Sequence, residues 1–185
     1  LARTRFAEDG LRPLRAIRFA SVLGFSLEAE TEEALGQELE VFAKVAWERK
    51  RDEVMRMLDE AATLGGALES LNRSGLLQAL APELSIEKCV AQMDACGVGR
   101  GLERLTIWLA ASGQNREQAQ ALCERWRLSK KNIRKVSIWL DAYRDLKVTS
   151  PLDSYELRRW LASIPPEEYS SMACIAAALD SNACH

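Results

Sequence analysis

The sequence predicts an all-α fold of irregular multi-helix domains, with no sheet in this chain. Hydrophobic residues recur at three- and four-residue spacing in almost every periodic stretch, and no stretch alternates β-branched and polar residues as a strand would. Glycine and proline separate these stretches, as turns require, and Ser129 is expected to cap the helix that begins at residue 130. We therefore expect helices near residues 9–23, 30–45, 47–62, 66–73, 86–96, 101–112, 116–126, 130–146, 153–163 and 166–180.

The composition is that of an ordinary soluble protein, with 48% hydrophobic and 28% charged residues and a net charge of −2 over 185 residues. Because the overall charge is slightly negative, nucleic-acid binding would have to come from a local basic face. No apolar run is long enough to cross a bilayer and no signal peptide opens the chain, so we expect a cytoplasmic protein. A start at Leu1 suggests a piece of a longer chain.

Cysteine and histidine limit the chemistry that this chain can perform. The five cysteines form no CxxC pair, and the single histidine, His185, is the last residue. A zinc site is therefore disfavoured, and buried free thiols in a reducing cytosol are expected. Catalysis by a Ser–His or Cys–His pair is disfavoured for the same reason.

A change of character near residue 85 predicts two domains, 1–84 and 85–185. The first carries strongly charged helices. The second has shorter helices and four tryptophans that we expect to anchor a second core: Trp108, Trp126, Trp139 and Trp160.

The stretch RFAEDGLRPLRAIRFASVLGF, residues 5–25, mixes charged and apolar residues in one predicted helix. Pro13 is tolerated in a first helical turn and moves the helix start to residues 10–12. At about 100° per residue, three arginines fall within an arc of roughly 120°: Arg12, Arg15 and Arg18. Apolar residues cover most of the opposite side and are expected in the core: Leu14, Ile17, Ala20 and Leu23.

Two interpretations of the acidic residues at the start of this helix remain open. Glu8 and Asp9 would favour the helix N-terminus and pair with Arg12 in a purely structural role. Alternatively, Asp9 and Arg12 read the edge of a base, because a carboxylate only accepts hydrogen bonds and a guanidinium only donates them. Cytosine and adenine present a matching amino donor beside a ring-nitrogen acceptor, whereas uracil and guanine present the reverse.

This stretch resembles the EDxxR nucleotide-recognition motif of bacterial CCA-adding tRNA nucleotidyltransferases and poly(A) polymerases. The resemblance continues through WERKRDEVMRML, residues 47–58, which is similar to the ERxRxE segment of that family. It extends to SGLLQALAPEL, residues 74–84, similar to the end of the family's neck region, and weakly to LSKKNIRKV, residues 128–136. Gly10 departs from the family pattern, which commonly has proline there, and Pro13 replaces a usual aliphatic residue.

The resemblance implies a role for each matching residue. The nucleotide-binding group would be Glu8, Asp9, Arg12 and Arg15, with Asp9 and Arg12 touching the base and Arg15 supporting them or the triphosphate. Supporting residues that brace the recognition helix would be Glu48, Arg49, Arg51 and Glu53; ion pairs on or between helices are the structural alternative for them.

The resemblance also implies a catalytic part that this chain lacks. The family transfers nucleotides from CTP and ATP with Mg²⁺ held by clustered carboxylates, and the expected GS…DxD signature is absent from the 185 residues. We expect the metal in a head domain upstream of Leu1, no metal ligands here, and no activity of this chain alone.

Residues 125–135, RWRLSKKNIRK, form a second candidate site for RNA. Their six basic residues are Arg125, Arg127, Lys130, Lys131, Arg134 and Lys135. Two lysines at a helix start oppose the helix dipole, which suggests an outside anion such as an RNA phosphate. A solvated basic face is the simpler alternative.

The sequence therefore predicts the neck and body part of an enzyme that adds C and A, or A alone, to tRNA or other RNA 3′ ends. A non-catalytic helical RNA-binding or adaptor module is the alternative, and a purely structural helical domain is a third possibility. The sequence does not separate CCA addition from CC addition, A addition or poly(A) synthesis.

Overall fold

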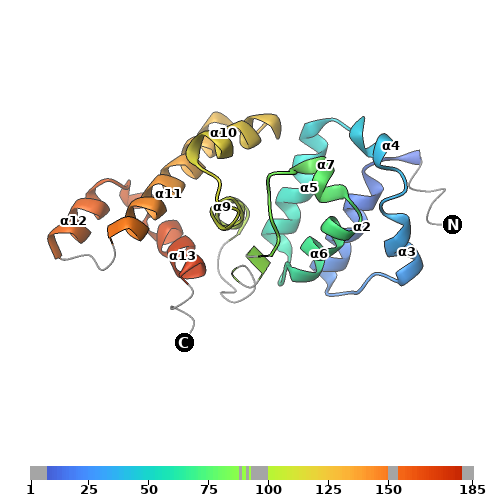
Figure 1. The fold of residues 1–185 in the computed structure, drawn as a ribbon, viewed down its shortest axis with the longest axis horizontal. Coiled ribbons are helices and arrows are strands. Elements are labelled where there is room, and N and C mark those ends of the chain that lie inside the picture. The colour runs from blue at the N-terminus through green and yellow to red at the C-terminus, as the bar shows by residue number, and fades with distance from the viewer. Residues whose placement is uncertain (1–7, 88, 91, 93–99, 150–153, 181–185) are drawn as a thin grey trace.

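The computed structural model, which describes residues 8–87, 89–90, 92, 100–149 and 154–180, confirms the all-α prediction (Figure 1). Strands are absent from this described part of the chain. Its helices, in chain order, are α2 (Arg12–Leu23), α3 (Ala29–Ala34), α4 (Leu39–Ala43), α5 (Trp47–Glu60), α6 (Gly65–Arg73), α7 (Leu76–Leu80), α9 (Leu102–Ala111), α10 (Arg116–Arg125), α11 (Lys130–Thr149), α12 (Ser154–Ala162), the 3-10 helix η1 (Pro166–Glu168) and α13 (Tyr169–Leu179).

The helices form two groups along the long axis of the molecule (Figure 1). In the first group α2 packs against α5 and α6, and in the second α11 packs against α9, α10 and α13. Contacts between α5 and α9 join the groups, so α5 is the helix of the first group that packs against the second. The predicted domain boundary at residues 84 and 85 falls between α7 and α9 and stays a prediction.

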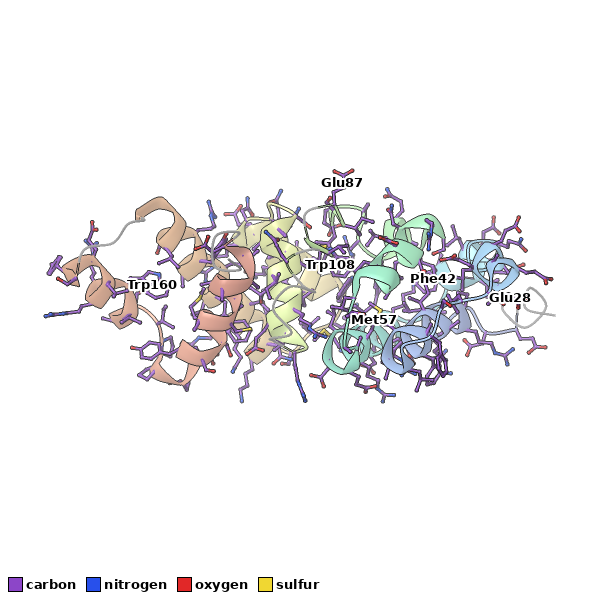
Figure 2. The ribbon with its side chains drawn as sticks, turned by 90° about the horizontal axis from the view of Figure 1, so that it is seen from below. Glu28, Phe42, Met57, Glu87, Trp108 and Trp160 are labelled. Atoms are coloured by element: carbon purple, nitrogen blue, oxygen red, sulfur yellow. The ribbon has the colours of Figure 1, made fainter. Side chains whose placement is uncertain are left out.

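The core contains most of the residues that periodicity predicted. Leu14 and Ile17 of α2 are fully buried, as are Trp108, Trp126 and Trp139, while Trp160 is half-buried. Phe42 and Met57 lie inside the first group and Trp108 inside the second (Figure 2). One assignment on α2 was wrong, because Leu23, expected in the core, is 58% exposed. Arg18, within the predicted arc of arginines, is only 6% exposed.

Tertiary contacts change two of the predicted helix boundaries. The helix expected over 30–45 is interrupted between α3 and α4, where Gly36 packs on the backbone of Ser74: a Cβ at Gly36 would lie 2.6 Å from that carbonyl oxygen. The short helix α7 was not predicted; it follows Gly75, whose φ of 75° is left-handed. The helix predicted at 86–96 lies largely outside the described residues.

The remaining sequence predictions concern the helix start, the thiols and membrane spans. Helix α2 begins at Arg12 with Pro13 in its first turn, as predicted. Cys89 and Cys123 are buried and form no disulfide, and burial raises the pKa of Cys123 to about 12. Cys174 is half-buried and also forms no disulfide, while Cys96, Cys184 and His185 lie outside the described residues. Among the described helices, none is long and apolar enough to cross a membrane.

Candidate nucleotide-recognition site

The turn before α2 holds the predicted acidic residues in a fixed backbone conformation. The Asp9 carboxylate accepts a hydrogen bond from the Leu11 backbone N–H at 3.1 Å, and the Asp9 carbonyl accepts one from Arg12 N–H at 2.9 Å. Gly10 lies directly against α4, because a Cβ there would stand 2.6 Å from the Val41 carbonyl. Glycine therefore lets this turn rest on α4, which fixes where the Asp9 side chain leaves the chain.

Positive charge surrounds the Asp9 carboxylate. Arg49 from α5 lies 3.4 Å from Oδ2 of Asp9, and Arg15 lies 4.0 Å from it. The hydrogen bond from Leu11 N–H and these arginines together lower the pKa of Asp9, although partial burial opposes them. Asp9 is therefore an ionised acceptor at neutral pH, with 27% of its side chain still exposed.

Arg12 emerges from the same turn and pairs with Glu8 at 2.6 Å. This is one of the ion pairs that the structural interpretation predicted. The Arg12 side chain remains 39% exposed. The structure thus brings Glu8, Asp9 and Arg12 together at one accessible helix start.

Glu53 of α5 is the buried centre of an ion-pair triad with Arg15 and Arg18 of α2. Its two carboxylate oxygens accept hydrogen bonds from Nε of Arg15 at 2.9 Å and Nε of Arg18 at 2.6 Å. Glu53 is only 4% exposed; burial alone would raise its pKa, but the two arginines outweigh burial and lower it. Since Arg15 also lies 4.0 Å from Asp9, the triad links the turn before α2 to α5.

Acid should weaken the fold through this triad. Because the pKa of Glu53 is lower in the folded protein, its ion pairs stabilise the fold fully above the ordinary value of 4.5 and lose this effect as the pH falls through the lower folded-state pKa. We expect the urea midpoint of the intact protein to fall more steeply from about pH 6 to about pH 3 than that of a Glu53→Gln variant. Parallel curves for the two proteins would contradict this expectation.

The other predicted supporting residues point in different directions. Glu48 is exposed in the first turn of α5, and Arg49 reaches Asp9 as described. Arg51 turns away from α2: its Nη1 donates to the carbonyl oxygen of Arg127 at 2.5 Å, beside the predicted RNA site.

Two further basic residues, which no sequence motif marks, lie buried beside the predicted site residues. One is Arg18, as above. The other is Lys50, 2% exposed, whose ammonium lies over the rings of Phe42 and Trp47 and donates to the Ala43 carbonyl at 3.2 Å. Burial lowers the pKa of Lys50. A lysine between two arginines gives no sequence signal of burial, so only the structure could identify it.

The six basic residues of 125–135 separate into two classes. Arg125 pairs with Glu83 at 2.7 Å, and Lys135 pairs with Glu168 at 2.7 Å, so both hold the fold together. The other four are exposed and make no ion pair within the described part of the chain: Arg127, Lys130, Lys131 and Arg134. We call these four residues the basic turn; they surround the junction of α10 and α11.

The backbone of this junction is tightly defined. Arg127 has a left-handed φ of 58°, its N–H donates to Glu124 O at 2.9 Å, and Leu128 N–H donates to Cys123 O at 2.9 Å. These bonds form a Schellman motif with arginine where glycine is usual. The Ser129 hydroxyl then accepts from Asn132 N–H at 3.2 Å, which confirms the predicted N-cap of α11.

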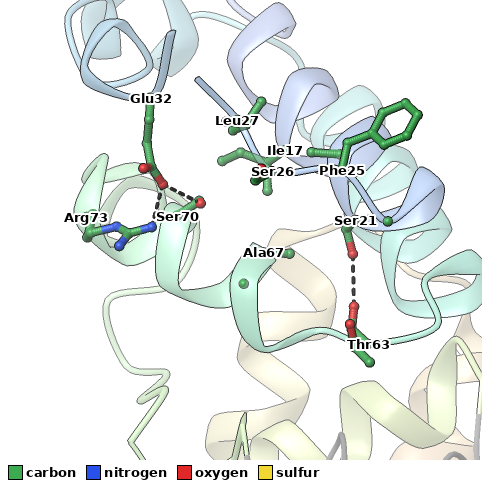
Figure 3. A pocket seen from close by; sticks show the side chains of 13 residues that line it. Ile17, Ser21, Phe25, Ser26, Leu27, Glu32, Thr63, Ala67, Ser70 and Arg73 are labelled. Atoms are coloured by element: carbon green, nitrogen blue, oxygen red, sulfur yellow. Dashed lines mark hydrogen bonds and ion pairs between the residues drawn. The ribbon is translucent and has the colours of Figure 1, made fainter. Parts of the chain in front are cut away.

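A cavity of about 430 Å³ lies apart from these residues, between α2, α3 and α6 (Figure 3). Phe25, Leu27 and Ala67 supply apolar lining. Glu32 accepts hydrogen bonds there from Ser70 at 2.7 Å and Arg73 at 2.5 Å, which together lower its pKa. The predicted site residues do not line this cavity.

Metal binding was predicted outside this chain. Within the described ranges no group of three or more His, Cys, Asp or Glu side chains could hold a metal ion. These residues therefore do not fit the Mg²⁺ that the resemblance implies.

Comparisons with known proteins agree with the motifs. Residues 24–87 match the family described as "Probable RNA and SrmB- binding site of polymerase A". The chain is 34% identical over 144 residues to the CCA-adding enzyme of Bacillus velezensis, which covers 75% of this chain and 36% of that protein. It also resembles the crystal structure of the Bacillus stearothermophilus CCA-adding enzyme in complex with CTP, with a TM-score of 0.75 and 27% identity over 97% of this chain and 44% of that one.

A third comparison supports the fold alone. The Thermotoga maritima CCA-adding enzyme complexed with tRNA superposes with a TM-score of 0.56 at 18% identity, over 95% of this chain and 49% of that one.

These matches first define a class: the chain is homologous to the RNA-binding, non-head region of enzymes that add nucleotides to RNA. It belongs to the family of CCA-adding enzymes and poly(A) polymerases. It spans between a third and a half of the length of these relatives, with 36% of the Bacillus velezensis enzyme and 44% of the Bacillus stearothermophilus structure covered.

Proposed function

We propose that this chain is the neck and body part of a cytoplasmic enzyme that adds C and A, or A alone, to the 3′ end of tRNA or another RNA. CTP and ATP are the substrates, and Mg²⁺ is held by a catalytic part outside this chain. The described residues recognise the base of the nucleotide and bind the RNA. The observation that carries this proposal is the fixed turn at which Asp9 and Arg12 are both accessible.

The chemistry of this turn fits cytosine and adenine. Ionised Asp9 accepts from the exocyclic amino group, and an N–H of Arg12 donates to the neighbouring ring nitrogen. Uracil and guanine would place a carbonyl against the carboxylate and a ring N–H against the guanidinium. Because those groups would be left unpaired, the wrong bases bind more weakly.

Contacts with α4 and α5 hold Asp9 and Arg12 in fixed relative positions. Gly10 rests on α4, Arg49 contacts Asp9 from α5, and the Glu53 triad locks α2 onto α5. A base-reading pair needs such support, because a misplaced donor or acceptor loses its discrimination.

The basic turn is the proposed RNA contact. Four exposed cations at the junction of α10 and α11 suit a phosphate backbone, which arginine and lysine bind without reading sequence. The similar Bacillus stearothermophilus enzyme, which was solved with CTP, supports the nucleotide half of the proposal.

Replacing Arg127 with glycine distinguishes the effect of this residue on stability from its effect on RNA binding. Glycine adopts the left-handed conformation without a Cβ clash, so we expect the free energy of unfolding to rise by about 0.5–1 kcal/mol. The loss of one phosphate contact should lower the slope of log Kd for tRNA against log salt by about 1. Urea denaturation and salt-dependent tRNA binding measure these effects; an unchanged salt slope would remove Arg127 from the RNA site.

The proposal is tested with the full-length protein, Mg²⁺ and a tRNA trimmed of its terminal CCA. Each nucleoside triphosphate is offered alone, then CTP with ATP, and products are resolved at single-nucleotide resolution. Addition that stops after three nucleotides identifies a CCA-adding enzyme. Two C residues, a single A or an open ladder of A identify the specialised enzymes and the poly(A) polymerase. No addition under any condition would contradict the proposal and favour the non-catalytic RNA-binding module.

A further inference from the structure

Three consecutive basic residues at the start of α5 bind three separate parts of the molecule. Successive helical side chains diverge by about 100°. Arg49 accordingly contacts Asp9, Lys50 donates to the Ala43 carbonyl of α4, and Arg51 donates to the Arg127 carbonyl between α10 and α11. The proposed nucleotide site and the proposed RNA site therefore meet within one turn of one helix.

The Arg51 guanidinium is held in one orientation. Its Nε and Nη2 both donate to Oδ1 of Asp52, at 2.9 and 2.7 Å, which leaves Nη1 directed at the Arg127 carbonyl at 2.5 Å. Only 24% of the Arg51 side chain is exposed. A lysine would carry the same charge but lacks the planar fork that makes these bonds together.

The carbonyl that Arg51 binds lies at the centre of the basic turn. Arg127 is the left-handed residue between α10 and α11, and Lys130 and Lys131 begin α11 three residues later. A hydrogen bond to this carbonyl therefore fixes how the basic turn faces α5. A second link supports the same position, because Arg125 lies 5.7 Å from the ring centre of Trp47, the first residue of α5.

We propose that Arg51 is a positioning residue that couples RNA binding at the basic turn to base reading at Asp9. RNA phosphates bound by the side chains of the basic turn fix its backbone, including the Arg127 carbonyl. Arg51 transmits this restraint to α5, and Arg49 transmits it to Asp9. The coupling rests on the proposed function, and it is reciprocal: bound CTP also favours bound RNA.

The test measures the Kd of the full-length protein for trimmed tRNA, with and without saturating CTP, in the absence of divalent metal so that no nucleotide is added. Wild-type protein should bind tRNA about fivefold or more tightly when CTP is present. Both Arg51→Lys and Arg51→Ala should bind tRNA about three- to tenfold more weakly and reduce the effect of CTP to less than about twofold. Arg56→Ala is the matched control, because Arg56 is an exposed arginine of the same helix and should leave both quantities unchanged.

The results distinguish three roles for Arg51: a contribution of charge alone, a contribution to the fold, and coupling between the two sites. Wild-type binding and coupling in Arg51→Lys would mean that Arg51 contributes only its charge, and coupling retained in Arg51→Ala would equally overturn the proposal. A purely structural role would lower the melting temperature without changing the effect of CTP, and Arg51→Lys keeps the test valid if the alanine variant does not fold. If the wild-type protein adds no nucleotide and binds no CTP, the proposed function itself fails; if it does both while its tRNA affinity ignores CTP, only the coupling fails.

Discussion

Replacing Glu53 with alanine is expected to lower the free energy of unfolding by about 3–5 kcal/mol. Glu53 is the carboxylate that faces Arg18 at 2.6 Å, and Arg18 is only 6% exposed. Removing Glu53 leaves a guanidinium in the interior of the first helix group without its nearest counter-charge, and it also releases Arg15. Breaking a buried ion pair from one side costs much more than the pair itself contributes.

Urea denaturation of the intact protein measures this effect against a closely matched control. Glu60 is also a carboxylate of α5 near Arg18, but it lies 3.9 Å away and is 45% exposed. Glu60→Ala should therefore change the free energy of unfolding by less than about 0.5 kcal/mol. Equal losses in the two variants would show that Glu53 is not the residue that locks α2 onto α5.

Replacing Asp9 with alanine should reduce discrimination between CTP and UTP by about 10- to 100-fold in the full-length enzyme. The variant removes the only proposed acceptor for the amino group of the base. It also removes the carboxylate that accepts a hydrogen bond from Leu11 N–H at the start of α2. We therefore expect the free energy of unfolding to fall by about 1 kcal/mol, far less than in Glu53→Ala.

The ratio of kcat/KM for correct and incorrect nucleotides measures this discrimination. Glu40→Ala is the control, since Glu40 carries an exposed carboxylate on α4, the helix on which Gly10 rests. It should keep most of the discrimination. Unchanged misincorporation in Asp9→Ala, with a lowered melting temperature, would instead support the purely structural interpretation of the acidic residues.

Local sequence signals predicted much of the fold. The helical periodicity, the Pro13 start of α2 and the Ser129 cap all depend on neighbours within a few residues, which a sequence displays directly. The break at Gly36 depends instead on the backbone of Ser74, 38 residues later in the sequence, and no local pattern could show it. A contact between residues distant in the sequence therefore explains why the helix predicted over 30–45 is interrupted.

In the candidate site, too, local spacing predicted some features, and others depend on residues distant in the sequence. Asp9 and Arg12 lie in one turn, so their proximity was predictable from spacing alone. The burial of Arg18 was not predictable, because a helical projection cannot show which part of the arginine arc a second helix will cover. Arg125 and Lys135 looked identical to the other basic residues, since their partners Glu83 and Glu168 are distant in the sequence.

The most direct test of the base-reading account is a crystal structure of the intact protein with bound CTP. The account predicts the Asp9 carboxylate within about 3 Å of the cytosine amino group and an Arg12 nitrogen within about 3 Å of the neighbouring ring nitrogen, with the Glu53 triad intact behind them. A cytosine held by other residues, with Asp9 and Arg12 turned away from it, would contradict the account.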